Sequence, residues 1–178
     1  LVKINGNPIM EYWLRKLESI GCEKVLINTH YLSEEVDKFL STRKKSSMII
    51  ESIFEKKLLG TASTLINNRK FFRESTTILI HADNMTNFKI SSLVDFHNER
   101  EGDNCLLTML TFNTNYPSSC GVVITDKKKI LRGFYEKIKN PPGNIANAAI
   151  YVFGDEFLED LIKEFPLAKD FSKDVIPN

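Results

Sequence analysis

Hydrophobic positions recur along the chain at two spacings, and the two spacings alternate. Residues 9–20 carry apolar side chains every three or four positions until Gly21 interrupts them, which predicts an amphipathic helix. The run 24–28 that follows is short and contains β-branched residues, which is typical of a strand. We therefore expect the helix to pack one face on a sheet.

The same alternation continues through the middle of the chain and changes near residue 111. Expected strands cover residues 47–53, 77–81, 105–111, 121–125, 130–135 and 146–153, and expected helices begin near Ser33, Gly60, Ser91 and Asp155. The strand–helix–strand order favours a mostly parallel mixed sheet with helices on both faces. A hairpin turn is expected at 126–129. We predict a single α/β domain over residues 1–178.

Composition narrows the function. The chain has 178 residues with 42% hydrophobic content, and 24 Lys plus Arg against 23 Asp plus Glu leave a net charge of +1. Such a balance gives no field that would collect nucleic acid or an anionic membrane. No apolar run approaches the ~18 residues of a membrane span. The three cysteines lack disulfide or zinc spacing, so we expect reduced thiols and a cytoplasmic protein.

A glycine turn precedes the helix that is expected after residue 60. A helix that begins after such a turn exposes backbone N–H groups, which can bind a phosphate, a ribose or the edge of a base. The segment Leu59, Gly60, Thr61 and Ala62 is therefore a candidate for nucleotide binding. A glycine before a helix is more often plain turn geometry, and Glu55 nearby would ordinarily be a solvated charge.

Asp83 follows an apolar run, 78–80, at the place where a buried strand ends. Ligands of open α/β sheets collect at the carboxyl ends of strands, and an uncompensated carboxylate there would be costly to bury. Mg²⁺ suits it, because this ion takes one or two carboxylates and completes its shell with water and substrate phosphates. The alternative is that Asp83 only forms a turn with Asn84 and Thr86.

Glu136 and Lys137 lie at the end of an expected strand. A carboxylate that accepts sugar hydroxyls and an amine that meets a phosphate would together suit a phosphorylated sugar. Neighbouring residues of a regular strand point to opposite faces, so a shared site requires the strand to end or bend here. The alternative is an ordinary pair of surface charges.

These stretches occur in the order and approximate spacing of a known family. They are GNPI at 6–9 with EYW at 11–13, NTHY at 28–31, LGTA at 59–62, the strand ending in Asp83, CGVV at 120–123, FYEK at 134–137, NAAIY at 147–151 and DFSKDVIP at 170–177. In this combination the chain resembles the sugar-1-phosphate nucleotidyltransferases, and most closely the mannose-1-phosphate and heptose-1-phosphate guanylyltransferase branch. Eight ordered matches favour the functional interpretation of each candidate.

The resemblance implies a Rossmann-like nucleotide-binding fold and an enzyme that joins a nucleoside triphosphate, here GTP, to a mannose- or heptose-type sugar 1-phosphate. Leu59, Gly60, Thr61 and Ala62 match the segment that contacts base and ribose, and Asp83 matches the catalytic aspartate that holds Mg²⁺. The sugar side is matched by Gly121 against the sugar, Glu136 at its hydroxyls, Lys137 near its phosphate and Asn147 as a further contact. The sugar phosphate would attack the α-phosphorus in line, so catalysis is positioning and charge neutralisation. Whether the protein forms a homo-oligomer stays an open question at this point.

The chain also departs from the family pattern. The glycine-rich phosphate loop would precede Leu1 and a second metal-binding aspartate would follow Asn178, so we expect a truncated chain that is inactive by itself. Ala82 stands where the family usually has glycine. A second hypothesis is therefore a non-catalytic regulatory module that keeps nucleotide or sugar binding. A phosphocholine cytidylyltransferase-like enzyme is a variant of the first hypothesis.

Overall fold

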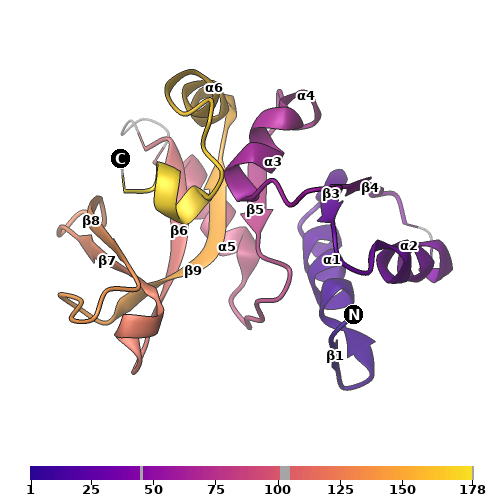
Figure 1. The fold of residues 1–178 in the computed structure, drawn as a ribbon, viewed down its shortest axis with the longest axis horizontal. Helices are drawn as coiled ribbons and strands as arrows, with labels where there is room; N and C mark the ends of the chain where they lie inside the picture. Colours follow the sequence, from indigo (N-terminus) through magenta and orange to yellow (C-terminus); the bar gives the residue numbers. More distant parts are fainter. Residues whose placement is uncertain (45, 101–104, 178) are drawn as a thin grey trace. The chain divides into compact units, whose positions relative to one another are not determined.

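The chain divides into two compact units in a computed structural model that describes residues 1–44, 46–100 and 105–177. The first unit consists of Leu1–Leu59 and Ala82–Ser92, and the second of Gly60–His81 and Leu93–Asn178 (Figure 1). This division into two units does not test the expected single domain over residues 1–178, which stays a prediction. Among the described residues, no helix is both long and apolar enough to cross a membrane.

The first unit contains the parallel strand pair that the sequence predicts. Its elements are β1 (Lys3–Ile4), β2 (Asn7–Pro8), α1 (Ile9–Ser19), β3 (Lys24–Thr29), α2 (Ser33–Thr42) and β4 (Ile49–Phe54). Strands β3 and β4 run parallel in register from Lys24↔Ile49 to Thr29↔Phe54, with α2 as the crossover. After α1, Gly21 takes a φ of +77°, which an L side chain rarely adopts and which turns the chain into β3.

Helix α1 begins directly after a short antiparallel hairpin. Asn7 pairs with Ile4 in the antiparallel hairpin of β1 and β2, and Pro8 occupies the position before the first helical residue. Two-residue strands carry too little pattern to be recognised from sequence. The apolar face of α1 is buried as expected through Ile9, Trp13, Leu14 and Leu17.

The second unit is built around β9. Its elements are α3 (Thr61–Asn67), α4 (Arg69–Phe72), β5 (Thr77–Ile80), β6 (Leu107–Asn113), the 3-10 turn η2 (Pro117–Ser119), β7 (Gly121–Thr125), β8 (Leu131–Glu136), β9 (Ile145–Phe153), α6 (Asp155–Glu164) and the π turn η3 (Phe171–Val175). Helix α5 (Ile90–Asn98) begins in the first unit and ends in the second. The hairpin turn between β7 and β8 closes through Asp126 as predicted, because its backbone N–H donates to the carbonyl of Ile130.

Every strand pair in the sheet of the second unit is antiparallel, so together with the parallel pair of β3 and β4 the described strands pair in both directions, which confirms the predicted α/β class with mixed pairing. Strand β9 is antiparallel to β5, β6 and β7, and β8 continues the sheet beyond β7. Phe153 pairs with both Thr77 and Leu107, so β5 and β6 run in the same direction but have β9 between them. Strand β9 comes from far along the chain, and the local hydrophobic pattern does not indicate that it lies between β5 and β6. For this reason the sequence suggests neighbouring parallel strands where the structure separates them.

The core of the second unit joins β9 to three flanking segments. Its buried members are Ala62, Leu65, Tyr151, Phe153, Leu158, Leu161, Ala168, Phe171 and Val175. The rings of Tyr151 and Phe171 lie 4.8 Å apart between centroids at an angle of 55°, a favourable tilted arrangement. The segment that ends in η3 is therefore packed directly on β9 and α3, at the place where several sequence candidates lie.

Candidate functional site

Asp83 lies in a turn that directly follows β5, and its side chain is exposed. Within the first unit, α1 holds this segment through two hydrogen bonds. Trp13 Nε1 donates to the carbonyl of Asn84 at 2.9 Å, and Lys16 Nζ donates to the carbonyl of Phe88 at 3.3 Å. The buried indole of Trp13 therefore fixes the residue next to the candidate metal ligand.

The chemistry of this turn fits a divalent ion only together with a substrate. Within the described part of the chain, the Asp83 carboxylate takes part in no hydrogen bond or ion pair. The same residues contain no group of three or more His, Cys, Asp and Glu side chains that could hold a metal by themselves. Mg²⁺ keeps several waters and accepts phosphate oxygens, so one available carboxylate suits it. The assignment of Asp83 to Mg²⁺ stays a prediction.

The loop around Gly60 is closed by the segment that precedes η3. Gly60 has a φ of +94°, and a methyl group placed on it would overlap the backbone carbonyl of Lys169. The Ala62 N–H donates to that carbonyl at 3.0 Å, and the Thr61 hydroxyl accepts from the Phe171 N–H at 2.9 Å. The glycine is therefore required for a close approach within the protein, and nucleotide binding by this loop stays a prediction.

Leu59 belongs to the first unit, where its backbone N–H donates to Glu55 Oε2 at 3.1 Å. Glu55 is only 6% exposed, so the expectation of a solvated charge at this position is wrong. The carboxylate turns inward because it satisfies a backbone donor of the turn that leads to Gly60. The sequence does not predict this hydrogen bond, because a glutamate beside other polar residues is ordinarily exposed to solvent.

The sugar-side candidates converge in the second unit. Gly121 pairs directly with Glu136 across β7 and β8. The antiparallel pair Val122↔Ala146 places Gly121 beside Asn147, one step along the ladder. Glu136, Gly121 and Asn147 thus form a row across three strands, and the space beside the glycine is taken up by the Glu136 carboxylate and the Phe134 ring. A methyl group on Gly121 would lie 2.5 Å from Glu136 Oε2 and 2.7 Å from the ring of Phe134.

Lys137 joins this row because the strand bends. Strand β8 ends at Glu136, and Lys137 has a left-handed φ of +50°. Its backbone N–H donates to the carbonyl of Cys120 at 3.1 Å, and its ammonium group lies 3.6 Å from Glu136 Oε1. A shared site for Glu136 and Lys137 requires the strand to end or bend at this point. The structure meets this requirement.

A bulge in β9 positions Asn147. Met109 pairs with Tyr151 whereas Thr111 pairs with Asn147, so two steps along β6 correspond to four along β9. Ala149, inside the bulge, has a φ of +54°. The extra residues shorten the path between Asn147 and Tyr151, whose side chains meet at 2.6 Å between Nδ2 and the phenol oxygen. In an unbroken strand, residues four apart would be separated by about 13 Å.

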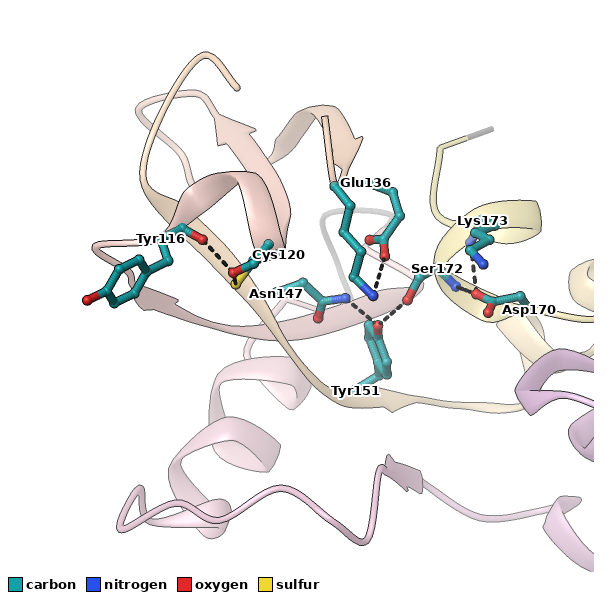
Figure 2. A network of polar contacts seen from close by, with 10 residues as sticks. Tyr116, Cys120, Glu136, Asn147, Tyr151, Asp170, Ser172 and Lys173 are labelled. Carbon is teal, nitrogen blue, oxygen red and sulfur yellow. Dashed lines mark hydrogen bonds and ion pairs between the residues drawn. The ribbon is translucent and has the colours of Figure 1, made fainter. Parts of the chain in front are cut away.

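The polar chain that begins at Asn147 continues into the C-terminal segment (Figure 2). The Tyr151 hydroxyl lies 3.4 Å from Ser172 Oγ, and Asp170 Oδ1 accepts from the Ser172 backbone N–H at 2.9 Å. Burial raises the pKa of the Tyr151 phenol, so the hydroxyl keeps its proton at neutral pH. A protonated phenol can both accept and donate a hydrogen bond.

Sequence reasoning missed three residues that support the candidates. Trp13, Tyr151 and Ser172 all lie within stretches that carry the family resemblance, but their side-chain roles depend on contacts far apart in sequence. A buried polar aromatic residue inside such a stretch is the signal that could have identified Tyr151 and Trp13. Of the nine predicted site residues, seven lie in the second unit, which Gly60 begins, whereas Leu59 and Asp83 lie in the first.

Comparison with known proteins gives a match over the whole chain. The model of the nucleotidyl transferase family matches residues 1–178. The mannose-1-phosphate guanylyltransferase catalytic subunit beta of Drosophila melanogaster is 30% identical over 183 residues, which cover 99% of this chain and 47% of that protein. A UTP-glucose-1-phosphate uridylyltransferase of Synechocystis is 25% identical over 172 residues, which cover 89% of this chain and 44% of that protein.

The fold is shared with solved structures. The crystal structure of HddC from Yersinia pseudotuberculosis in complex with GMP-PN matches with a TM-score of 0.77 at 19% identity, covering 98% of this chain and 74% of that chain. At this identity the match shows the fold alone, and it confirms the Rossmann-like class. The chain spans about half the length of the curated relatives it matches.

Proposed function

This chain belongs to the nucleotidyl transferase family, a family of enzymes, and from that membership we propose that the protein containing it joins a nucleoside triphosphate to a sugar 1-phosphate. The products are a nucleotide sugar and pyrophosphate. GTP and a mannose- or heptose-type sugar are the specific substrates of this proposal, supported by the guanylyltransferase among the relatives. Because the relatives also include a uridylyltransferase, the base of the nucleoside triphosphate most needs a direct test. We place the reaction in the cytoplasm, where nucleoside triphosphates are available.

One observation carries the proposal beyond family membership. Glu136 and Asn147 lie on the two strands that flank Gly121, and Lys137 directly follows Glu136 at the end of β8. A carboxylate, an ammonium group and an amide are thereby placed at neighbouring positions of the sheet. This set matches the hydroxyls and the phosphate of a phosphorylated sugar, because carboxylates accept hydrogen bonds from hydroxyls and ammonium groups pair with phosphate.

The chemistry requires no protein nucleophile. A phosphate oxygen of the sugar 1-phosphate attacks the α-phosphorus, a new P–O bond forms, and the bond to the bridging oxygen breaks as pyrophosphate leaves with the electron pair. Glu136 and Asn147 hold the sugar, and Lys137 moves from Glu136 to the sugar phosphate to fix the direction of attack. Asp83 would hold Mg²⁺, which neutralises negative charge on the nucleotide phosphates when it is bound.

The test uses the full-length protein and measures pyrophosphate release. GTP, ATP, UTP, CTP and dTTP are each combined with mannose 1-phosphate, a heptose 1-phosphate, glucose 1-phosphate and phosphocholine. We expect turnover with GTP and a mannose- or heptose-type phosphate. Asp83→Asn should reduce the rate by at least about 100-fold and raise the Mg²⁺ concentration required. Asp95→Asn, at an exposed aspartate of α5, is the matched control and should leave the rate unchanged.

Two outcomes would contradict the proposal in different ways. Turnover with another base or sugar would correct the specific substrates and keep the reaction. If no pair of substrates is turned over but calorimetry detects nucleotide or sugar binding, the enzyme hypothesis is wrong and the hypothesis of a non-catalytic binding module takes its place.

A further inference from the structure

The amide of Asn147 has only one possible orientation. Its Oδ1 accepts from the Ala149 backbone N–H at 2.8 Å, which requires an oxygen at that place. Its Nδ2 therefore faces the Tyr151 hydroxyl at 2.6 Å and donates to it. A flipped amide would bring two N–H groups together at Ala149. The bulge of β9 thus fixes which end of the side chain is the donor.

The direction of the next hydrogen bond follows from the first. Because the Tyr151 oxygen accepts from Asn147, its own hydrogen is available to donate. Ser172 Oγ, at 3.4 Å, is the neighbouring acceptor on the C-terminal segment. Ser172 is itself placed by Asp170, whose Oδ1 accepts from the backbone N–H groups of Ser172 and Lys173 at 2.9 and 3.1 Å. The order is Asn147 to Tyr151 to Ser172 (Figure 2).

This order determines what Asn147 presents to a ligand. Each Asn amide nitrogen carries two hydrogens, and one of them is used by Tyr151. Within the described residues, the second hydrogen has no partner, and the Asn147 side chain is partly exposed. On the other side of Gly121, the carboxylate of Glu136 offers only acceptors. The row therefore presents a donor at one end and an acceptor at the other.

We propose that Tyr151 is a positioning residue that holds Asn147 as a hydrogen-bond donor toward an oxygen atom of the sugar 1-phosphate. The inference rests on the proposed function for the identity of the ligand. Tyr151 itself is fully buried, so we expect it to act through Asn147 and not by direct contact with the substrate. Without the Tyr151 hydroxyl, the amide keeps only its hydrogen bond from the Ala149 N–H, so Nδ2 is held less firmly and its contact with the sugar weakens.

The first test is kinetic and uses Tyr151→Phe in the full-length protein. The ring and its contact with Phe171 remain, so only the hydroxyl is removed. We expect KM for the sugar 1-phosphate to rise about three- to tenfold, as for the loss of one hydrogen bond, with KM for the nucleoside triphosphate unchanged. Ser172→Ala should change the same constant in the same direction by less. Tyr135→Phe, on an exposed tyrosine of β8, is the matched control and should change neither constant.

The second test does not depend on activity. In protein labelled with ¹⁵N at asparagine, the Asn147 side-chain signals are identified by their loss in Asn147→Asp. One Nδ2 hydrogen of the wild type should exchange slowly with solvent, and Tyr151→Phe should speed its exchange at least about fivefold. Faster exchange supports the positioning role even if no sugar 1-phosphate is turned over. Unchanged exchange, or an equal rise of KM for both substrates, would overturn it.

Discussion

Trp13 and Asn84 are joined by a hydrogen bond of 2.9 Å from the indole Nε1 to the backbone carbonyl, although 71 positions separate them in sequence. Trp13 is buried in α1 with 5% of its surface exposed, and Asn84 follows the candidate metal ligand Asp83. A rigid helix therefore fixes the backbone of an otherwise irregular segment. The order of the Asp83 turn depends on a residue of the first helix.

Replacing Trp13 by Phe should loosen this turn. The carbonyl of Asn84 loses its donor and the helix loses part of its buried surface, so we expect the free energy of unfolding to fall by roughly 1–3 kcal/mol. The Mg²⁺ concentration for half-maximal turnover should also rise. Urea unfolding and Mg²⁺ titration measure the two effects. Lys16→Met removes an exposed bond to the same segment and should cost less than about 0.5 kcal/mol; equal effects of both variants would contradict the role of Trp13.

Gly121 should not tolerate even a methyl group. In Gly121→Ala the new carbon would meet Glu136 Oε2 at 2.5 Å and the Phe134 ring at 2.7 Å, so the carboxylate must leave the row. We expect KM for the sugar 1-phosphate to rise at least about tenfold, measured by pyrophosphate release. Gly143→Ala is the control, because its nearest neighbour, Ile124, would lie at an ordinary 3.5 Å. A sugar KM unchanged in Gly121→Ala would remove Glu136 from the site.

Lys129 lies in the hairpin turn between β7 and β8 with a φ of +66°. A left-handed backbone costs an L residue about 1 kcal/mol and costs glycine almost nothing. Lys129→Gly should therefore raise the free energy of unfolding by about 0.5–1 kcal/mol in thermal or urea unfolding. Lys127→Gly removes the same charge from the same turn at a residue without positive φ, and it should lower stability instead. Destabilisation by both variants would contradict this interpretation of the turn.

Asp174 makes stability depend on pH in acid. The backbone N–H groups of Asp170 and Lys169 donate to its carboxylate at 2.9 and 2.8 Å and lower its pKa below the ordinary 3.8. Because the folded pKa is the lower one, its contribution is complete above the unfolded pKa and is lost as pH falls through the folded pKa. Wild type should exceed Asp174→Asn in unfolding free energy at pH 6, and the difference should shrink below pH ~4. A difference that is constant from pH 7 to 2 would contradict this assignment.

The sequence located most helices and strands because each carries its own pattern. The apolar spacing of α1 and the alternation around β3 and β4 are local properties, and the structure confirms them. The site candidates Gly121, Glu136 and Asn147 were also found by residue type and order. Their convergence was inferred only from the family resemblance, because spacing along a chain does not determine which strands become neighbours.

Other features could not be predicted because their partners are distant. The insertion of β9 between β5 and β6, the contact of Gly60 with Lys169 and the inward turn of Glu55 all depend on backbone groups that have no sequence signature. The same holds for the hydrogen bond from Asn147 to Tyr151. It exists because a bulge shortens the strand between them.

The sequence by itself determined the alternation of strands and helices, the family resemblance and the chemical types of the candidate residues. Only the tertiary structure decided that Lys137 bends back onto Glu136 and that the bulge of β9 fixes the donor end of Asn147. The physical reason is that hydrophobic spacing and turn residues act within a few positions. Hydrogen-bond direction and the space left by a glycine arise only when separate strands pack together.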